Sequence, residues 1–415
     1  MRAVRTEPGL VSPIVVRRLV VAAAVLAAVA GLILSSFVLE VGPAAAATDT
    51  AGTKAKAVSA GSNHTCAITD SGGVKCWGKN AQGQLGDDTR TDSPVPVDVV
   101  GLGSGVAAIS AADGGASPDH TCALTESGGI KCWGYNAYGQ LGDGRTVRSL
   151  VPVDVVGLGS GVKAISANGD HTCALTDSGG VKCWGRNGDG ELGDGTTTDS
   201  LVPVDVKGLP SGVKAISSSV DHTCALTDSE EVKCWGKNGS GQLGDGTRAD
   251  SSVPVDVKDL PGATTAISAG HHYTCARRRT GSVRCWGYNA HGQLGDGTTT
   301  TSLVPVMVMS LGDSLAVSAD DDHTCVRTPA PRGVECWGRN LEGQLGDGTR
   351  TDSFTRVGVE GLGSGATAIS AGSHYTCALI NSGRVKCWGS NGFGQLGDGT
   401  ITHYSLVPVD VKGLG

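Results

Sequence analysis

The chain has 415 residues, a formal net charge of -7 and 65 glycines, but only 7 Trp, 6 Tyr and 3 Phe. So few aromatic side chains exclude one large aromatic core, and the glycine content favours an all-β repeat array that buries many thin layers. Residues 1–47 carry four arginines against two glutamates, a net of +2, which leaves -9 for the rest. A phosphate-binding surface needs a basic field, so we expect no nucleic-acid partner.

The N-terminal 47 residues have the order of an export signal. Residues 19–39 form an apolar run, arginines precede it, and Pro43 with four alanines follows it. This order predicts a secretory signal cleaved after Ala47. The run is also long enough to span a bilayer, so an uncleaved membrane anchor is the alternative. We predict one apolar helix within residues 1–47, a linker over residues 48–56, and a body that is secreted or held at the cell surface.

The rest of the chain is a repeat. All seven tryptophans occur as Cys-Trp-Gly, spaced by 56 residues and then five times by 51. A fixed period in this range, with strands in each unit, indicates a propeller. We therefore predict one domain over residues 57–415. The tryptophans are Trp77, Trp133, Trp184, Trp235, Trp286, Trp337 and Trp388.

Each unit reads as four short strands, here named A to D in chain order. In residues 162–212 they are VKAISA, HTCALT, GVKCWG and SLVPVDV, with the alternation and β-branched residues that strands favour. Proline within D predicts an outer edge strand, because proline cannot donate to a ladder. The fold class is thus all-β, a seven-bladed β-propeller. If blades were built D-A-B-C, residues 406–411 would complete the first blade and close the ring.

The recurring H-T-C-A-L…V-K-C-W-G-x-N-x-x-G-Q-L-G resembles the regulator of chromosome condensation repeat. This resemblance implies a seven-bladed propeller of about this period. The chain departs from the pattern at Asp88, where other units have Gly, and at Glu191, where they have Gln. By compartment, the nearest analogue in the resembled family is the secreted bacterial β-lactamase inhibitor protein II. Its inhibitory role is not carried over, because only scaffold residues match.

The 14 cysteines occur two per unit. If strands B and C of the third unit fold about Ser178, with Gly179 in the left-handed position, Cys173 lies opposite Cys183 within disulfide reach. Opposed pairs in an exported chain predict seven hairpin disulfides. The predicted pairs are Cys66 with Cys76, Cys122 with Cys132, Cys173 with Cys183, Cys224 with Cys234, Cys275 with Cys285, Cys325 with Cys336, and Cys377 with Cys387.

Two of these hairpins depart from the pattern. Glu230 takes the glycine position of the fourth turn, where we expect strain, and the sixth pair is one residue further apart. Zinc sites favour C-x2–4-C spacing, which nine intervening residues do not fit. We predict no metal and no cofactor.

Other residues recur once per unit, and we interpret them as structural because a catalytic group is needed only once. The Asn after Cys-Trp-Gly is expected to cap a turn. The Asp of G-Q-L-G-D offers too few oxygens for calcium. The acidic residues 320–322 are expected to form a solvated loop. A histidine is expected to start strand B and to bond a neighbouring loop: His64, His120, His171, His222, His272, His323 and His374.

Because strands in a blade alternate in direction, loops A–B and C–D must share one face, and the units differ most in these loops. Tyr and Arg are typical interface anchors, so this face is the predicted binding surface for a protein or a cell-surface glycan. Neutral variation of exposed loops is the alternative. The candidates are Tyr135, Tyr138, Arg186, Tyr288, His291, Arg339 and Phe393.

We therefore expect a monomeric, non-catalytic scaffold outside the cytoplasm. The sequence has no G-x-S-x-G, H-E-x-x-H or phosphate loop. One alternative is guanine nucleotide exchange, the role of the resembled family's founder. Export would separate the chain from cytosolic GTPases and therefore argues against this role. Another is an enzyme acting on cell-wall glycan, which would need a unique pair of carboxylates in a central pocket.

Overall fold

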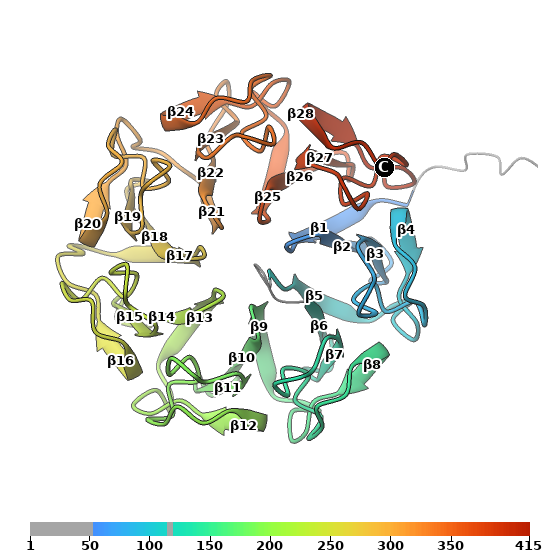
Figure 1. The fold of residues 1–415 in the computed structure, drawn as a ribbon, viewed down its shortest axis with the longest axis vertical. Coiled ribbons are helices and arrows are strands. Elements are labelled where there is room, and N and C mark those ends of the chain that lie inside the picture. Colours follow the sequence, from blue (N-terminus) through green and yellow to red (C-terminus); the bar gives the residue numbers. More distant parts are fainter. Residues whose placement is uncertain (1–52, 114–118) are drawn as a thin grey trace, which may run out of the picture. The chain divides into compact units, whose positions relative to one another are not determined.

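The structure is a computed structural model that describes residues 53–113 and 119–415, so the helix predicted within residues 1–47 lies outside the described residues. These described residues belong to one compact unit. It consists of seven four-stranded antiparallel sheets arranged as blades around an axis (Figure 1). The predicted seven-bladed, all-β fold is confirmed. Among the described residues, no helix has the length and apolar character needed to cross a membrane.

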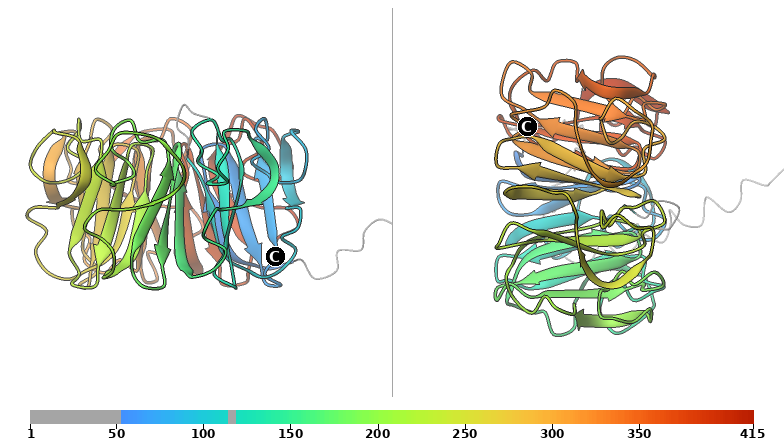
Figure 2. Two further views of the ribbon diagram at one scale, coloured as in Figure 1. Left: turned by 90° about the horizontal axis from the view of Figure 1, so that it is seen from below. Right: turned by 90° about the vertical axis from the view of Figure 1, so that its left-hand side faces the viewer.

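Each blade is built from four consecutive strands, with strand A nearest the axis and strand D at the rim (Figures 1 and 2). The A strands are β1 (Ala55–Ala60), β5 (Val106–Ala111), β9 (Val162–Asn168), β13 (Val213–Ser218), β17 (Thr264–Ala269), β21 (Ala316–Asp320) and β25 (Ala366–Ala371). The B strands are β2 (His64–Thr69), β6 (His120–Thr125), β10 (His171–Thr176), β14 (His222–Thr227), β18 (Tyr273–Arg278), β22 (His323–Arg327) and β26 (Tyr375–Ile380).

The C strands are β3 (Val74–Gly78), β7 (Ile130–Gly134), β11 (Val181–Gly185), β15 (Val232–Gly236), β19 (Val283–Gly287), β23 (Val334–Gly338) and β27 (Val385–Ser390). The D strands are β4 (Ser93–Asp98), β8 (Ser149–Asp154), β12 (Ser200–Asp205), β16 (Ser251–Asp256), β20 (Ser302–Met307), β24 (Ser353–Gly358) and β28 (Tyr404–Asp410). Strand D, which carries a proline in every blade but the sixth, is the outer edge of each sheet, as predicted. Strand β1 begins inside the segment 48–56 that was predicted as a linker.

The ring does not close by exchange of a strand, so that hypothesis was wrong. Strand β28 pairs with β27 in the seventh blade, and β1 to β4 already make a complete first sheet. Closure instead uses contacts between complete blades. Thr53 forms a parallel bridge with Leu414, and the indole Nε1 of Trp77 donates to the carbonyl oxygen of Gln395 at 2.9 Å. Each unit supplies its own four strands in order, so no strand is left to exchange.

The predicted register of the disulfide hairpins is confirmed. Cys173 lies opposite Cys183 in the β10–β11 ladder, and Gly179 has a φ of 83°. Glu230 has a φ of 68°, which is strained for a residue with a Cβ, as predicted for that turn.

All seven predicted disulfides are present, each between strands B and C of one blade and each with a Cα–Cα distance of 4.1 Å. The sixth disulfide spans 11 residues rather than 10, and the longer turn of that hairpin takes up the extra residue, as predicted. The bonds join Cys66 to Cys76, Cys122 to Cys132, Cys173 to Cys183, Cys224 to Cys234, Cys275 to Cys285, Cys325 to Cys336, and Cys377 to Cys387.

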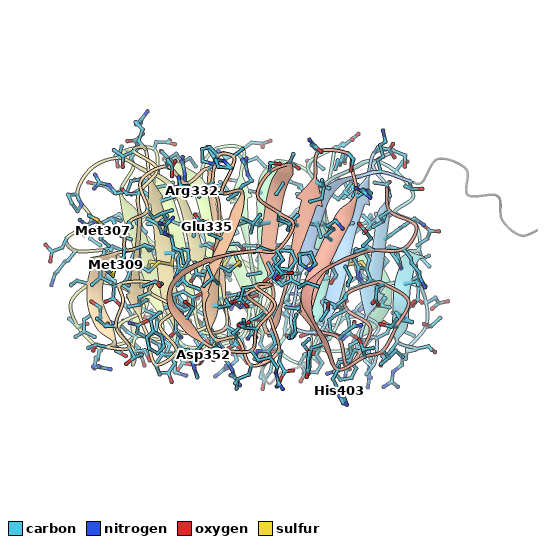
Figure 3. All side chains as sticks on the ribbon, turned by 90° about the horizontal axis from the view of Figure 1, so that it is seen from above. Met307, Met309, Arg332, Glu335, Asp352 and His403 are labelled. Carbon is cyan, nitrogen blue, oxygen red and sulfur yellow. A yellow bond between two sulfur atoms is a disulfide. The ribbon has the colours of Figure 1, made fainter. Side chains whose placement is uncertain are left out.

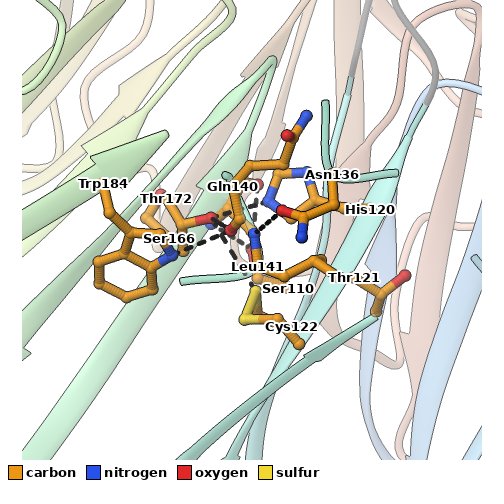
Figure 4. The surroundings of a disulfide bond; sticks show 12 residues. Ser110, His120, Thr121, Cys122, Asn136, Gln140, Leu141, Ser166, Thr172 and Trp184 are labelled. Atoms are coloured by element: carbon orange, nitrogen blue, oxygen red, sulfur yellow. Dashed lines mark hydrogen bonds between the residues drawn. A yellow bond between two sulfur atoms is a disulfide. The ribbon is translucent and has the colours of Figure 1, made fainter. Parts of the chain in front are cut away.

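The boundary between blades explains why the repeat contains both Cys-Trp-Gly and G-Q-L-G. The indole Nε1 of Trp184 donates to the carbonyl oxygen of Gln140 in the preceding blade at 2.9 Å (Figure 4). Gly142 packs against that indole with a φ of +68°, and a Cβ added to it would lie 2.7 Å from Nε1. One hydrophobic cluster fills each boundary between neighbouring blades, seven in all. The core is therefore a ring of thin layers, as the composition predicted.

The repeated asparagine caps its turn as predicted. In the third blade the Oδ1 of Asn187 accepts the backbone N–H of Leu192 at 2.9 Å, and its Nδ2 donates to the carbonyl oxygen of Thr198 at 3.0 Å. The repeated aspartate stabilises the same loop. The carboxylate of Asp194 accepts hydrogen bonds from the backbone N–H and the hydroxyl of Thr196, both at 2.8 Å.

Candidate functional site: an acid–histidine arc on one face

A histidine starts strand B in only five of the seven blades, so the predicted set was wrong at two positions. Strands β18 and β26 begin with Tyr273 and Tyr375, and His272 and His374 precede them in the A–B loop. The other five histidines are fully buried, and each Nε2 lies 2.8 Å from a threonine hydroxyl in the next blade. Their structural role is confirmed, but their partner is a side chain rather than a loop backbone.

Burial favours the neutral imidazole at four of these five positions, and the threonine partner fixes which ring nitrogen carries the hydrogen. Thr172, for example, donates its hydroxyl hydrogen to the carbonyl oxygen of Gln140, so its Oγ1 accepts a hydrogen bond from the Nε2–H of His120. Burial lowers the pKa of His120 to about 3 and that of His171 to about 4. The same cause lowers the pKa of His222 to about 3 and that of His323 to about 4.

At the other two boundaries a tyrosine replaces the histidine. The hydroxyl of Tyr273 lies 2.9 Å from that of Thr324, and the hydroxyl of Tyr375 lies 2.9 Å from that of Thr65. The longer phenol needs room, which Gly270 provides, because a Cβ there would lie 2.4 Å from the ring of Tyr273. The histidine displaced from strand B then sits one residue earlier, in the A–B loop.

The displaced His272 and His374 lie among carboxylates of neighbouring blades, together with His271. We call the set the arc: Asp221, His271, His272, Asp321 and His374. The Nδ1 of His272 lies 3.3 Å from the Oδ2 of Asp221, and the rings of His271 and His272 stack at 4.3 Å. Asp321 holds two histidines, with His271 Nδ1 at 3.2 Å from its Oδ1 and His374 Nδ1 at 3.2 Å from its Oδ2. The arc thus connects the A–B loops of blades four to seven.

Neighbouring groups shift the pKa values of two arc residues, Asp221 and His271. Burial alone would raise the pKa of Asp221, but the hydrogen bond with His272 and the Lys237 ammonium, 3.1 Å from its Oδ2, hold that pKa well below its usual range. Burial opposes the protonated form of His271, but the hydrogen bond to Asp321 and nearby carboxylates raise the pKa of His271 overall.

Three predicted partner-binding residues come together beside the arc. His291 lies with its Nδ1 3.1 Å from the Oδ2 of Asp352, and Arg339 places a guanidinium nitrogen 3.2 Å from the Oδ2 of Asp322. The Nε2 of His291 is 3.8 Å from the same Asp322 oxygen, so one carboxylate joins both.

Tyr288 completes this group, because its ring meets His272 edge-on at 6.4 Å between centroids. Figure 3 shows Asp352 and His403, both in C–D loops, at one face of the propeller, and Arg332, in a B–C loop, at the opposite face.

The other four candidates lie elsewhere around the ring. Tyr135 lines a hollow of about 280 Å³ together with Gln82 and Arg148, and Tyr138 is exposed. Burial and the nearby Asp170 raise the pKa of the Tyr135 phenol.

Arg186 and Phe393 each contact a charged neighbour of their own. A guanidinium nitrogen of Arg186 is 3.6 Å from the Oδ2 of Asp189 and another is 4.0 Å from the Oε1 of Glu191. The ring of Phe393 lies below the ammonium of Lys79 at 5.1 Å. The seven candidates therefore do not form one patch, and only Tyr288, His291 and Arg339 converge.

The acidic residues 320–322 are not a solvated loop, contrary to expectation. Asp320 is only 5% exposed and is hydrogen-bonded to Asp113, and its burial beside that carboxylate raises the pKa of Asp320 well above its usual range. Ser62 and Ser373 donate to the Oδ1 of Asp113 at 2.8 and 2.7 Å. Glycoside hydrolysis needs carboxyl groups about 5 Å apart or more, so a pair in direct hydrogen-bond contact lacks that geometry.

Sequence reasoning missed most of the arc, although a signal was present. Four units read Asp-His-Thr-Cys at the start of strand B, whereas the fifth and seventh read His-Tyr-Thr-Cys. The tyrosine marks a shift of the histidine by one residue. That shift moves the imidazole from the boundary between blades to the loop.

Comparison with known proteins agrees with the geometry. Residues 38–326 match the RCC1-like domain, and residues 336–379 and 382–415 match the regulator of chromosome condensation (RCC1) repeat. The ultraviolet-B receptor UVR8 of Arabidopsis thaliana is 32% identical over 350 residues, which cover 82% of this chain and 78% of UVR8. The mitochondrial RCC1 domain-containing protein RUG3 of the same plant is 32% identical over 289 residues, covering 67% of this chain and 64% of RUG3.

Among solved structures, Prp20p of Saccharomyces cerevisiae superposes with a TM-score of 0.71 at 19% identity, covering 87% of each chain. At that identity the likeness shows the fold alone. The structure of Prp20p is described together with its binding to Gsp1p and histones.

Proposed function

Because the chain belongs to the family of RCC1-like propellers, we propose that it is a non-catalytic scaffold that binds a protein or a cell-surface glycan outside the cytoplasm. Binding of proteins is a property of family members such as Prp20p, which binds Gsp1p and histones. A protein partner is therefore the first expectation for this chain. Its binding surface is the face formed by the A–B and C–D loops.

Two features support the location. Seven disulfides, which include all 14 cysteines, suit an oxidising compartment. The apolar run over residues 19–39 follows arginines and precedes a small-residue stretch, the order of an export signal. Mass spectrometry of the mature protein in the medium should find seven intact disulfides and an N-terminus at Thr48. A reduced chain retained in the cytosol would contradict this location.

The observation that carries the proposed surface is the contrast between repeated and blade-specific residues. The repeated His, Trp and Asn are buried at blade boundaries and in turns, where they form the scaffold. The blade-specific Tyr288, His291 and Arg339 are half-buried beside the arc on one face. Aromatic and arginine side chains held in place by ion pairs are the residue types that carry binding energy at interfaces.

A capture experiment tests this surface. The full chain, tagged after Gly415, is incubated with the producer's envelope and secreted fractions, next to a variant carrying Tyr288→Ala, His291→Ala and Arg339→Ala. The matched control carries Glu126→Ala, Arg279→Ala and Arg332→Ala in B–C loops of the opposite face. A partner retained by the wild type and the control but lost from the first variant supports the proposal. Equal capture by all three, or no capture by any, overturns it.

A further inference from the structure

The arc contains side chains with the donor chemistry of a metal site. In residues 53–113 and 119–415, one ligand atom each from Asp221, His271 and His272 lie within 4.8 Å of one another. Zinc binds imidazole nitrogen and carboxylate oxygen at about 2.0–2.2 Å, so neighbouring ligands in a tetrahedral site are roughly 3.3 Å apart. The Nδ1 of His272 and the Oδ2 of Asp221 are already 3.3 Å apart. A small movement of His271 would complete the set.

A further carboxylate orients one of these ligands. Asp321 lies 3.2 Å from the Nδ1 of His271, which leaves the Nε2 of that ring available to a cation. Histidine ligands in metal sites usually donate their second N–H to a carboxylate in this way. The other oxygen of this carboxylate, Oδ2 of Asp321, lies 3.2 Å from the Nδ1 of His374, which holds the carboxylate in place.

We propose that Asp221, His271 and His272 bind one divalent zinc ion on the face of the A–B loops. Two nitrogens and one carboxylate oxygen suit zinc, and three protein ligands leave a fourth position to a water molecule. The side chains of His271 and His272 are 22% and 36% exposed, so solvent reaches the site. This metal site goes beyond the proposed binding function and needs no partner for its test.

The ammonium of Lys237 competes with a zinc ion for the carboxylate of Asp221. This ammonium lies 3.1 Å from the Oδ2 of Asp221 and neutralises the carboxylate that a zinc ion would use. The side chain is 40% exposed, so it can swing into solvent when a cation binds. Removal of this lysine should therefore strengthen zinc binding, whereas general damage to the fold would weaken it.

Isothermal titration calorimetry with zinc chloride tests the proposal. The full chain is produced in an oxidising compartment without a polyhistidine tag and is dialysed against a chelator and then buffer. We expect one zinc per chain. His272→Ala and Asp221→Asn should each weaken binding at least about tenfold, and Asp321→Asn about 10–100-fold. Lys237→Met should tighten binding about tenfold, because a like charge beside the ion is removed.

A histidine of the same face serves as the control. His403→Ala, an exposed C–D loop residue outside the arc and outside the proposed binding surface, should leave the zinc affinity unchanged. Absence of wild-type binding overturns the proposal. So does unchanged affinity in both His272→Ala and Asp221→Asn, or an equal loss in His403→Ala. A Lys237→Met variant that binds zinc no better than wild type also contradicts it, and loss of folding cannot imitate the gain expected there.

Discussion

The hydroxyl of Tyr273 donates a 2.6 Å hydrogen bond to the carbonyl oxygen of His323 across the boundary between the fifth and sixth blades. The preceding boundary instead uses an imidazole, His222, which lies 2.8 Å from the hydroxyl of Thr274. The phenol both joins the blades and takes the place of the strand-B histidine. This substitution leaves His272 in the loop beside Asp221.

Tyr273→Phe should destabilise the propeller by about 1–2 kcal/mol, because it leaves the buried carbonyl oxygen of His323 without the phenol that donates to it. The midpoint of urea unfolding, followed by tryptophan fluorescence, measures this loss. The matched control is Tyr404→Phe, whose phenol is only half-buried and should change stability by less than about 0.5 kcal/mol. A similar loss in both variants would show that the buried hydrogen bond is not the cause.

The buried histidines should make the fold sensitive to acid. In the unfolded chain a histidine takes up a proton near pH 6.5, but burial delays this to about pH 3 for His120 in the folded chain. The unfolded state therefore binds more protons between these values, and stability falls as the pH drops, by up to about 1.4 kcal/mol per pH unit for each such histidine.

His120→Gln should make the slope of stability against pH shallower by that amount between about pH 6 and pH 4.5, because glutamine does not titrate. Urea unfolding at several pH values gives the slope. His403→Gln, at an exposed position, is the control and should leave the slope unchanged. An unaltered slope in His120→Gln would contradict the assignment.

Glu191 should destabilise the fold at neutral and higher pH. Burial raises the pKa of Glu191 to about 7, so the folded chain holds a proton that the unfolded chain releases near pH 4.5. The stability that this group contributes is fully present below pH 4.5 and is lost as the pH rises through 7. Glu191→Gln, which restores the repeat, should raise the free energy of unfolding at about pH 8 by about 2–3 kcal/mol. At about pH 4 the gain should vanish, and an equal gain at both values would disprove titration as the cause.

The glycines between blades are required by packing as well as by backbone conformation. Gly142 and Gly157 have φ values of +68° and +72°, but only Gly142 faces an indole, while nothing lies within 4 Å of a Cβ at Gly157. Gly157→Ala should cost about 1 kcal/mol for the left-handed backbone alone. Gly142→Ala should cost about 1–3 kcal/mol more because it overpacks the boundary with Trp184. Thermal unfolding of the two variants measures the difference, and equal losses would rule out the packing term.

The sequence by itself determined the scaffold. The 51-residue spacing of tryptophan, the alternation within strands and the opposed cysteines predicted the blades, and the structure confirms them along with the pairing of Cys173 with Cys183. These features are local, because a strand, a turn and a hairpin disulfide depend on residues within about ten positions of one another. The repeat then forms the same four-stranded blade seven times.

Only the tertiary structure decided the arc and the closure of the ring. Asp221, His272 and Asp321 come from three successive units of the 51-residue repeat, and they meet because each A–B loop stands beside that of the next blade. A shift of one residue, marked by Tyr273, decides whether an imidazole fills a blade boundary or faces solvent. Local patterns do not encode distances between blades. Those distances follow from the packing of each complete sheet on its neighbour. Two contacts set this packing: a tryptophan indole against a glycine, and a histidine or tyrosine side chain against a threonine hydroxyl.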